Sequence, residues 1–214
     1  MNQKEKSLNT KRQIACAAMQ LFGTKGYEQT SLMDIADAIH MTKGAIYHHF
    51  ANKQSLLEYL TVMTQEDMLC FVKTVVEDGV LDTNQKVAKI IGYFVDGKQE
   101  QVLIQNSWVE KVPFALLDTI RVSNKELAPY FEKLIMEASI RDGVQMKWAK
   151  ELSEVLVLLF DIWLDPVIFH LKEEEAVAKL EFIYEMLSKF NVSIIDETNF
   201  DKMKSLYLRG KYQK

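Results

Sequence analysis

Apolar residues recur along most of this chain at the three- and four-residue spacing of an α-helix. The first such stripe consists of Ile14, Ala17, Ala18, Leu21 and Phe22. A stripe of this kind predicts an amphipathic helix that buries one face. The strict alternation of apolar and polar residues that marks a half-buried strand is not found. The pattern therefore predicts an all-α fold.

The start of the chain predicts a first helix in a group of three. Thr10 and Gln13 have the spacing of a capping box, so we expect this helix to run from about Thr10 to Lys25. Residues 1–9 would then form a loose basic arm. Gly26 would end the helix in a left-handed conformation.

Two short helices follow, separated by a tight turn. Ser31 with Asp34 predicts the start of the second helix, and Thr42 is a suitable N-cap for the third. Ile46 and Phe50 lie four residues apart and are expected to face the first two helices. The outward face of the third helix would then carry Lys43, Gly44, Ala45, Tyr47 and His48.

A long fourth helix is predicted over about residues 53–78, and no Gly-, Ser- or Pro-rich linker interrupts it. We therefore expect an N-terminal domain over residues 1–52 that is joined rigidly to a helical domain over residues 53–214. Further helices are predicted over residues 82–97, 98–110, 124–141, 149–171, 173–191 and around 200–208.

Composition narrows the class of protein. Hydrophobic residues make up 48% of the chain, with only 3 Pro and 8 Gly, which is typical of a soluble helical protein. The polar start lacks the apolar segment of a secretory signal, and the most apolar stretch, residues 155–164, covers about half a membrane span. We expect a cytoplasmic protein with no membrane partner. Cys16 and Cys70 lack metal-ligand spacing and are expected to be at least half-buried thiols rather than a disulfide.

The formal net charge of −4 is unevenly distributed along the chain. Residues 1–53 hold seven Lys and Arg against four Asp and Glu, a net charge of +3, which leaves −7 for the remaining residues. A basic N-terminal segment in an otherwise acidic chain favours a local phosphate-binding surface.

Residues 30–53 read TSLMDIADAIHMTKGAIYHHFANK. Three parts of this segment resemble the helix-turn-helix signature of the tetracycline-repressor (TetR) family of bacterial transcriptional regulators: T-S-x-x-D-I-A, T-K-G-A-I-Y-H-H-F and the following N-K. The resemblance is specific over about residues 10–60. Over the body it is general, resting on the helical pattern and on ELAPYFEKLIMEASIRDGV at residues 126–144. It implies a DNA-binding domain followed by a helical domain for ligand binding and dimerisation.

The residues expected to bind DNA are Ser31, Thr42, Lys43, Gly44, Ala45, Tyr47, His48, His49 and Lys53. Small side chains at the start of the third helix would let its backbone approach base edges. Ser31, at a helix N-terminus, and Lys53 would contact phosphates and fix the position of the domain on the duplex.

Three of these residues allow other interpretations. Tyr47 could belong to the core instead of donating its hydroxyl to a phosphate. His48 and His49 could suggest a metal site, but neighbouring helical residues point about 100° apart and cannot chelate one ion together. We therefore expect no metal and no cofactor.

Residues 155–164 are nearly apolar all round, which is more than one core-facing stripe needs. The resemblance implies that the last two long helices pair with a second copy, with Val155, Leu159, Ile162, Phe182 and Met186 at the interface. A fully buried central helix in a monomer is the alternative. A two-fold dimer would present two recognition helices roughly 34 Å apart to a palindromic operator in double-stranded DNA.

The resemblance also implies a small-molecule inducer inside the body. The candidate pocket residues are Trp108, Phe114, Met136, Trp148, Asp161 and Trp163, although aromatic and Met residues at helical spacing are also ordinary core residues. Asp161 and Asp165 lie four residues apart on an apolar helix, and a buried carboxylate needs a partner. A cationic ligand, a Lys or Arg from elsewhere, or exposure to solvent would each supply one.

These observations favour a homodimeric repressor that a small molecule releases from its operator. An activator or a corepressor-dependent regulator would share every feature used here. A helical small-molecule-binding protein that does not use DNA is a further alternative. The chain carries no nucleophile elbow, phosphate loop or metal-ligand cluster, so we do not expect an enzyme.

Overall fold

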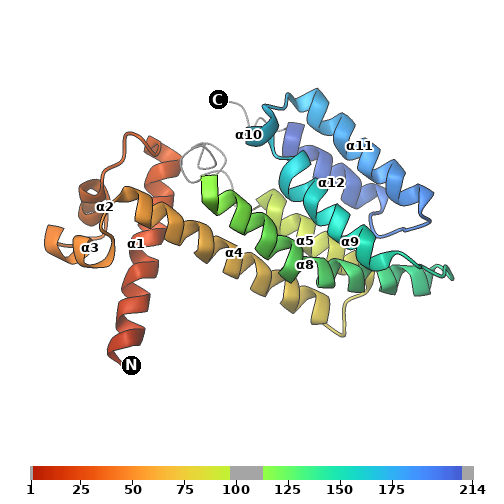
Figure 1. Cartoon of the computed structure of the whole chain (residues 1–214), viewed down its shortest axis with the longest axis horizontal. Helices are drawn as coiled ribbons and strands as arrows, with labels where there is room; N and C mark the ends of the chain where they lie inside the picture. The colour runs from red at the N-terminus through yellow and green to blue at the C-terminus, as the bar shows by residue number, and fades with distance from the viewer. Residues whose placement is uncertain (1, 97–112, 209–214) are drawn as a thin grey trace. The chain divides into compact units, whose positions relative to one another are not determined.

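The computed structural model describes residues 2–96 and 113–208, which form helices joined by short turns and contain no strand (Figure 1). The helices are α1 (Gln3–Lys25), α2 (Leu32–Ala38), α3 (Lys43–His49), α4 (Lys53–Glu77), α5 (Thr83–Asp96), α8 (Pro113–Arg141), α9 (Ala149–Leu158), the π-helical η1 (Leu159–Trp163), α10 (Pro166–Phe169), α11 (Glu173–Lys189) and α12 (Glu197–Leu208). The predicted all-α fold is confirmed. Among the helices described, none has the length and hydropathy needed to span a bilayer.

The described residues group into two compact units, with the division inside α4 between Thr64 and Gln65. We call residues 2–64 the head unit and residues 65–96 with 116–208 the body unit. Helix α4 begins at Lys53, as predicted, and continues without a break to Glu77.

The head unit has its own hydrophobic core, built from α1, α2, α3 and the start of α4. Ile14, Ile35 and Ile46 are fully buried in it, and Phe50 is nearly so. Burial of each such side chain stabilises the fold by about 1.5–3 kcal/mol. The prediction that Ile46 and Phe50 face inward is confirmed, and their burial fixes the orientation of α3.

The predicted start of the first helix is wrong. Helix α1 begins at Gln3, because the Asn2 side chain accepts the Glu5 N–H while the Glu5 carboxylate accepts the Asn2 N–H, which makes a complete capping box. The Thr10 hydroxyl donates to the Lys6 carbonyl inside the helix, as Thr often does at a helical position. Residues 3–9 are therefore helical and do not form a loose arm.

Helix α1 ends at Gly26, as predicted, but in a different conformation. Gly26 has φ 88° and ψ 150°, so its backbone is extended at positive φ and not left-handed helical. This region is open almost only to glycine. The Gly26 N–H still donates to the Phe22 carbonyl and closes the last turn.

Two further predictions about the later helices are wrong. Helix α8 starts at Pro113 and not near residue 124, and Pro suits the first turn of a helix because its missing N–H is not needed there. The predicted helix over residues 98–110 lies outside the described residues. The predicted continuous helix over residues 149–171 is interrupted by η1 and by Asp165, which caps α10 by accepting the Ile168 N–H.

The C-terminal helix predicted around residues 200–208 is confirmed as α12, which begins earlier, at Glu197. It packs on α5 and α11 within the body unit (Figure 1). The side chain of Asn199 is buried there and donates to the Asn84 carbonyl of α5.

Cys16 and Cys70 are both exposed, which corrects the prediction that they are at least half-buried. Cys16 lies between the buried Ala15 and Ala17, but three residues after Gln13 and four before Gln20, both of which are exposed. This spacing places it on the polar face of α1.

Candidate nucleic-acid interface

Helices α2 and α3 form a helix-turn-helix in the head unit. The turn is closed by the Met41 N–H, which donates to the Ala36 carbonyl at 2.8 Å, and by His40 in a left-handed conformation with φ 56°. The Thr42 side chain then accepts the Ala45 N–H at 3.3 Å, so Thr42 is the N-cap of α3, as predicted. The two helices are thus held at a fixed angle by backbone geometry.

The start of α2 is held by a charged cluster. The Asp34 carboxylate accepts the Ser31 N–H at 2.7 Å and the Ser31 hydroxyl at 2.6 Å, and the Lys25 ammonium lies 2.8 Å away. The hydrogen bond from Lys25, followed by those from Ser31, holds the pKa of Asp34 well below its usual range. An ionised Asp34 therefore connects the end of α1 to the start of α2.

The outward face of α3 consists of Lys43, Gly44, Tyr47 and His48, all exposed, beside the half-buried Ala45. Tyr47 has 44% of its surface exposed, so the alternative that it belongs to the core is wrong. A Cβ atom added to Gly44 would meet no other atom within 4 Å. The packing of the head therefore does not require glycine at this position.

Three of the predicted residues come together beside this face. An open depression lies between the start of α2 and the start of α4, lined by residues 28–32, Tyr47 and residues 51–53. It contains Ser31, Lys53 and the exposed ring of Tyr47. Hydroxyl and ammonium groups of this kind are typical donors to phosphate oxygens.

Lys53 also has a structural role that the sequence did not predict. Its ammonium donates to the Tyr27 carbonyl at 2.6 Å and to the Glu28 carbonyl at 3.4 Å, and it lies 4.2 Å from the centre of the Tyr27 ring. Lys53 thus fixes the turn that leads into α2. No local sequence pattern links residues 26 positions apart.

His49 lies at the end of α3 and is half-buried. Burial lowers its pKa below the usual value, and the charges of His48 and Lys11 add to this effect. His49 therefore remains neutral at physiological pH. The Lys11 ammonium lies 5.7 Å from the ring centres of Phe50 and Tyr59, so α1 borders this end of α3.

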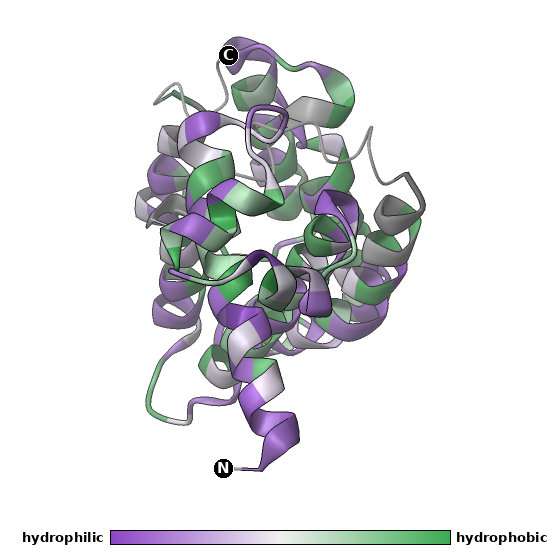
Figure 2. Cartoon of the chain, turned by 90° about the vertical axis from the view of Figure 1, so that its left-hand side faces the viewer, coloured by the Kyte–Doolittle hydropathy of each residue, from purple (hydrophilic) through white to green (hydrophobic). Residues whose placement is uncertain are grey.

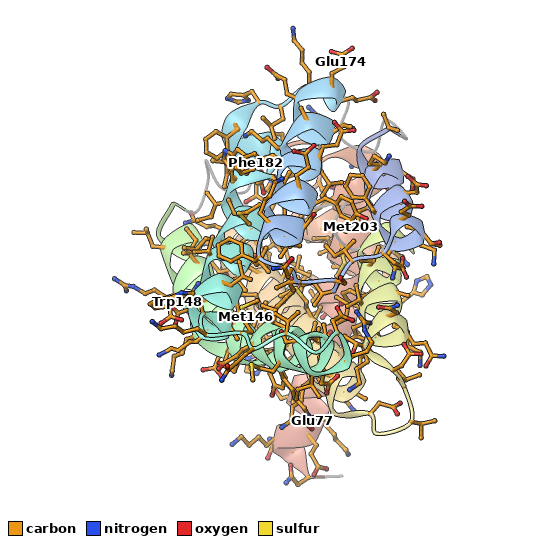
Figure 3. The ribbon with its side chains drawn as sticks, turned by 90° about the vertical axis from the view of Figure 1, so that its right-hand side faces the viewer. Glu77, Met146, Trp148, Glu174, Phe182 and Met203 are labelled. Carbon is orange, nitrogen blue, oxygen red and sulfur yellow. The ribbon has the colours of Figure 1, made fainter. Side chains whose placement is uncertain are left out.

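The candidate ligand residues lie at separate places along the chain. Trp108 lies outside the described residues, and Phe114 lies in the first turn of α8. Met136 and Trp148 are exposed, so their side chains do not line an enclosed pocket of a single chain. The Trp148 side chain is labelled in Figure 3. Asp161 and Trp163 both belong to η1.

Asp161 is the unusual member of this group. Its Oδ2 atom is buried and has no hydrogen-bond partner among the described residues, while the buried Ser123 of α8 donates a hydrogen bond to its carboxylate. Burial raises the pKa of Asp161 to about 6, and the charge of Asp165 acts in the same direction. Lys179, on α11, donates to the Trp163 carbonyl at 2.8 Å.

The raised pKa of Asp161 predicts a pH-dependent stability. The folded state holds this proton more tightly than the unfolded state, so the free energy of unfolding should fall as pH rises from about 4 to above 6, by up to about 3 kcal/mol. Asp161→Asn should remove that fall. Urea unfolding of both proteins between pH 4 and 7.5 measures it, with Asp201→Asn, an exposed site, as the control for loss of one charge. A constant difference between wild type and Asp161→Asn across this range would contradict the assignment.

Comparisons with known proteins identify the head. Residues 14–60 match the model of bacterial regulatory proteins of the tetR family. The chain is 27% identical over 186 residues to the transposon Tn10 TetC protein of Escherichia coli, covering 85% of this chain and 91% of that protein. It is 43% identical over 53 residues to the probable acrEF/envCD operon repressor of Escherichia coli strain K12, covering 25% of this chain and 24% of the repressor.

Solved structures share the fold. Salmonella enterica GusR aligns with a TM-score of 0.57 at 20% identity, over 86% of this chain and 95% of that one. A TetR/AcrR-family regulator from Thermobifida fusca aligns with a TM-score of 0.53 at 17% identity, over 96% and 97% of the two chains. The helix-turn-helix and these comparisons together identify residues 14–60 as a DNA-binding domain of the TetR family of bacterial regulatory proteins, and the chain as a DNA-binding transcriptional regulator.

Proposed function

We propose that this protein is a homodimeric repressor that binds a palindromic operator through α3 and is released by a small molecule bound in the body. In this account residues 1–52 bind DNA, and residues 53–214 pair the two chains and bind the ligand. The observation that carries the DNA-binding part is the outward face of α3, where an exposed Lys43 and Tyr47 flank a glycine that the fold itself does not need.

The roles of the head residues follow from their positions. Lys43 and His48 are exposed on α3 and would reach base edges in the major groove, while Gly44 and Ala45 allow close approach. Ser31, Tyr47 and Lys53 line the depression and would donate to phosphates. Thr42 and His49 would act mainly by holding the two ends of α3.

Exposed apolar side chains support dimerisation through the body. Val155 on α9 is 44% exposed and Phe182 on α11, labelled in Figure 3, is 56% exposed. The Phe182 ring meets the Trp163 ring edge to face, with 5.7 Å between the ring centres. Leu159, Ile162 and Met186 are partly buried beside them. A second copy would cover these side chains, because exposed apolar patches often mark protein–protein interfaces.

Release by ligand is supported by the Oδ2 atom of Asp161, a buried acceptor to which none of the described residues donates a hydrogen bond. A ligand could supply the missing donor. A ligand that binds one arrangement of the body more tightly would shift the protein toward that arrangement. An activator would use the same surfaces. Transcription from the operator with and without the protein separates the two roles, and a repressor lowers it.

The role of α3 predicts the effect of two substitutions. Lys43→Ala and Tyr47→Ala should each weaken binding to operator DNA roughly tenfold or more, because each removes a contact to the duplex without touching the core. Fluorescence anisotropy on a labelled duplex measures the affinity, and circular dichroism checks the fold. Lys133→Ala, at an exposed lysine of α8, is the control for loss of one positive charge. Unchanged affinity in both α3 variants would refute this role.

The proposed interface predicts a change of oligomeric state. Phe182→Glu should convert the dimer to a monomer at micromolar concentration, because it places two carboxylates in an apolar contact related by two-fold symmetry. Sedimentation velocity measures the mass. Val80→Glu makes the same kind of change at a 93% exposed site in the turn after α4 and should leave the dimer intact. A dimer that persists in Phe182→Glu would place the interface elsewhere.

A further inference from the structure

The first turns of α1 extend beyond the core of the head. Residues 2–9 are all exposed, and the first buried residue of the helix is Ile14. The turns next to the N-terminus are largely hydrophilic (Figure 2). This stretch is nevertheless a regular helix, closed at its start by the Asn2–Glu5 capping box. It gains nothing from core packing, so the fold of the head does not explain its length.

The net positive charge of the head resides in this extension. Residues 2–13 contain Lys4, Lys6, Lys11 and Arg12 against Glu5 alone, a net charge of +3, whereas residues 14–53 are neutral overall. The Glu5 carboxylate is already engaged in the helix cap. Lysines in the first turn also interact unfavourably with the helix dipole. An external anionic partner would explain why they are present.

The geometry singles out one face of the extension. Lys4 and Lys11 are seven residues apart, so they point within about 20° of each other and lie about 10 Å apart along the helix. Lys11 borders the end of α3, since its ammonium lies 5.7 Å from the ring centres of Phe50 and Tyr59. The face of Lys4 therefore continues the surface at the end of α3. Lys6 points about 160° away from Lys4.

We propose that the Lys4–Lys11 face of α1 binds the phosphate backbone of DNA that flanks the segment contacted by α3. Helix α1 holds these lysines in fixed positions. It would extend the DNA contact beyond the major-groove segment that α3 contacts. Each neutralised phosphate adds about one unit to the slope of log affinity against log salt. The proposal rests on DNA binding by α3, and it does not depend on dimerisation or on release by ligand.

The test compares two lysines of the same helix in the full-length protein. Lys4→Gln should reduce the salt slope by about one unit for each bound chain and weaken binding roughly three- to tenfold for each bound chain near 0.1 M KCl, measured on a duplex selected by the wild-type protein from a random library. Lys6→Gln removes the same charge on the opposite face and should have less than half that effect. Glutamine keeps the helix propensity of lysine nearly unchanged. Hydroxyl-radical footprints should lose protection at the outer edge of the site in Lys4→Gln only.

Each other outcome overturns the proposal. Equal effects of the two substitutions would mean that α1 contributes only non-specific electrostatic attraction to DNA. No effect of either substitution would mean that the extension does not reach DNA. In both cases Lys43→Ala shows whether DNA binding by α3 still holds. If α3 binds the duplex, Lys43→Ala loses affinity even though the proposed role of the Lys4–Lys11 face is refuted. Binding of Lys4→Gln that matches wild type at every salt concentration would likewise refute the contact.

Discussion

The burial of two side chains under α3 is the constraint on which the DNA-binding surface depends. Ile46 is fully buried and Phe50 nearly so, and both lie on the same face of the helix. Because these residues fix the inward face, the exposed residues of α3 have only one possible orientation. A rotation of α3 by a single residue, about 100°, would bury Tyr47 and expose Ile46.

Polar contacts then place this surface relative to the rest of the head. Asp34 joins Ser31 to Lys25, and Lys53 holds the carbonyls of Tyr27 and Glu28. These bonds are few, but they connect the ends of three helices where backbone groups would otherwise be left without partners. Ser31 and Lys53 also line the open depression beside α3. In the proposed function, one set of side chains would therefore both hold the fold and contact phosphates.

Local sequence patterns predicted the features whose causes are local. The caps at Ser31 and Thr42, the inward face of α3 and the start of α4 at Lys53 each follow from a few neighbouring residues, and the structure agrees with all of them. The predicted start of α1 was wrong because Thr10 and Gln13 have the spacing of a capping box. The capping box that forms consists of Asn2 and Glu5. The break after α9 had a visible signal in Asp165 and Pro166, which suit a new helix start better than a helix interior.

Contacts between distant parts of the chain could not be predicted in this way. The donor to Asp161 is Ser123, and the partners of Lys53 lie in the turn after α1, so only the packed structure reveals either pairing. The exposed state of Met136 and Trp148 likewise depends on which helices pack together and not on their own spacing. Tertiary packing decides such cases, because an apolar residue at helical spacing has the same local pattern at a core, an interface or a pocket.

The most direct test of this account is selection of bound duplexes from a random-sequence library by the purified full-length protein, followed by sequencing. The account predicts enrichment of an inverted repeat whose half-sites are about ten base pairs apart from centre to centre, or a multiple of that spacing, because two copies of α3 would enter major grooves on one side of the duplex. Recovery of sequences without any common motif would contradict it.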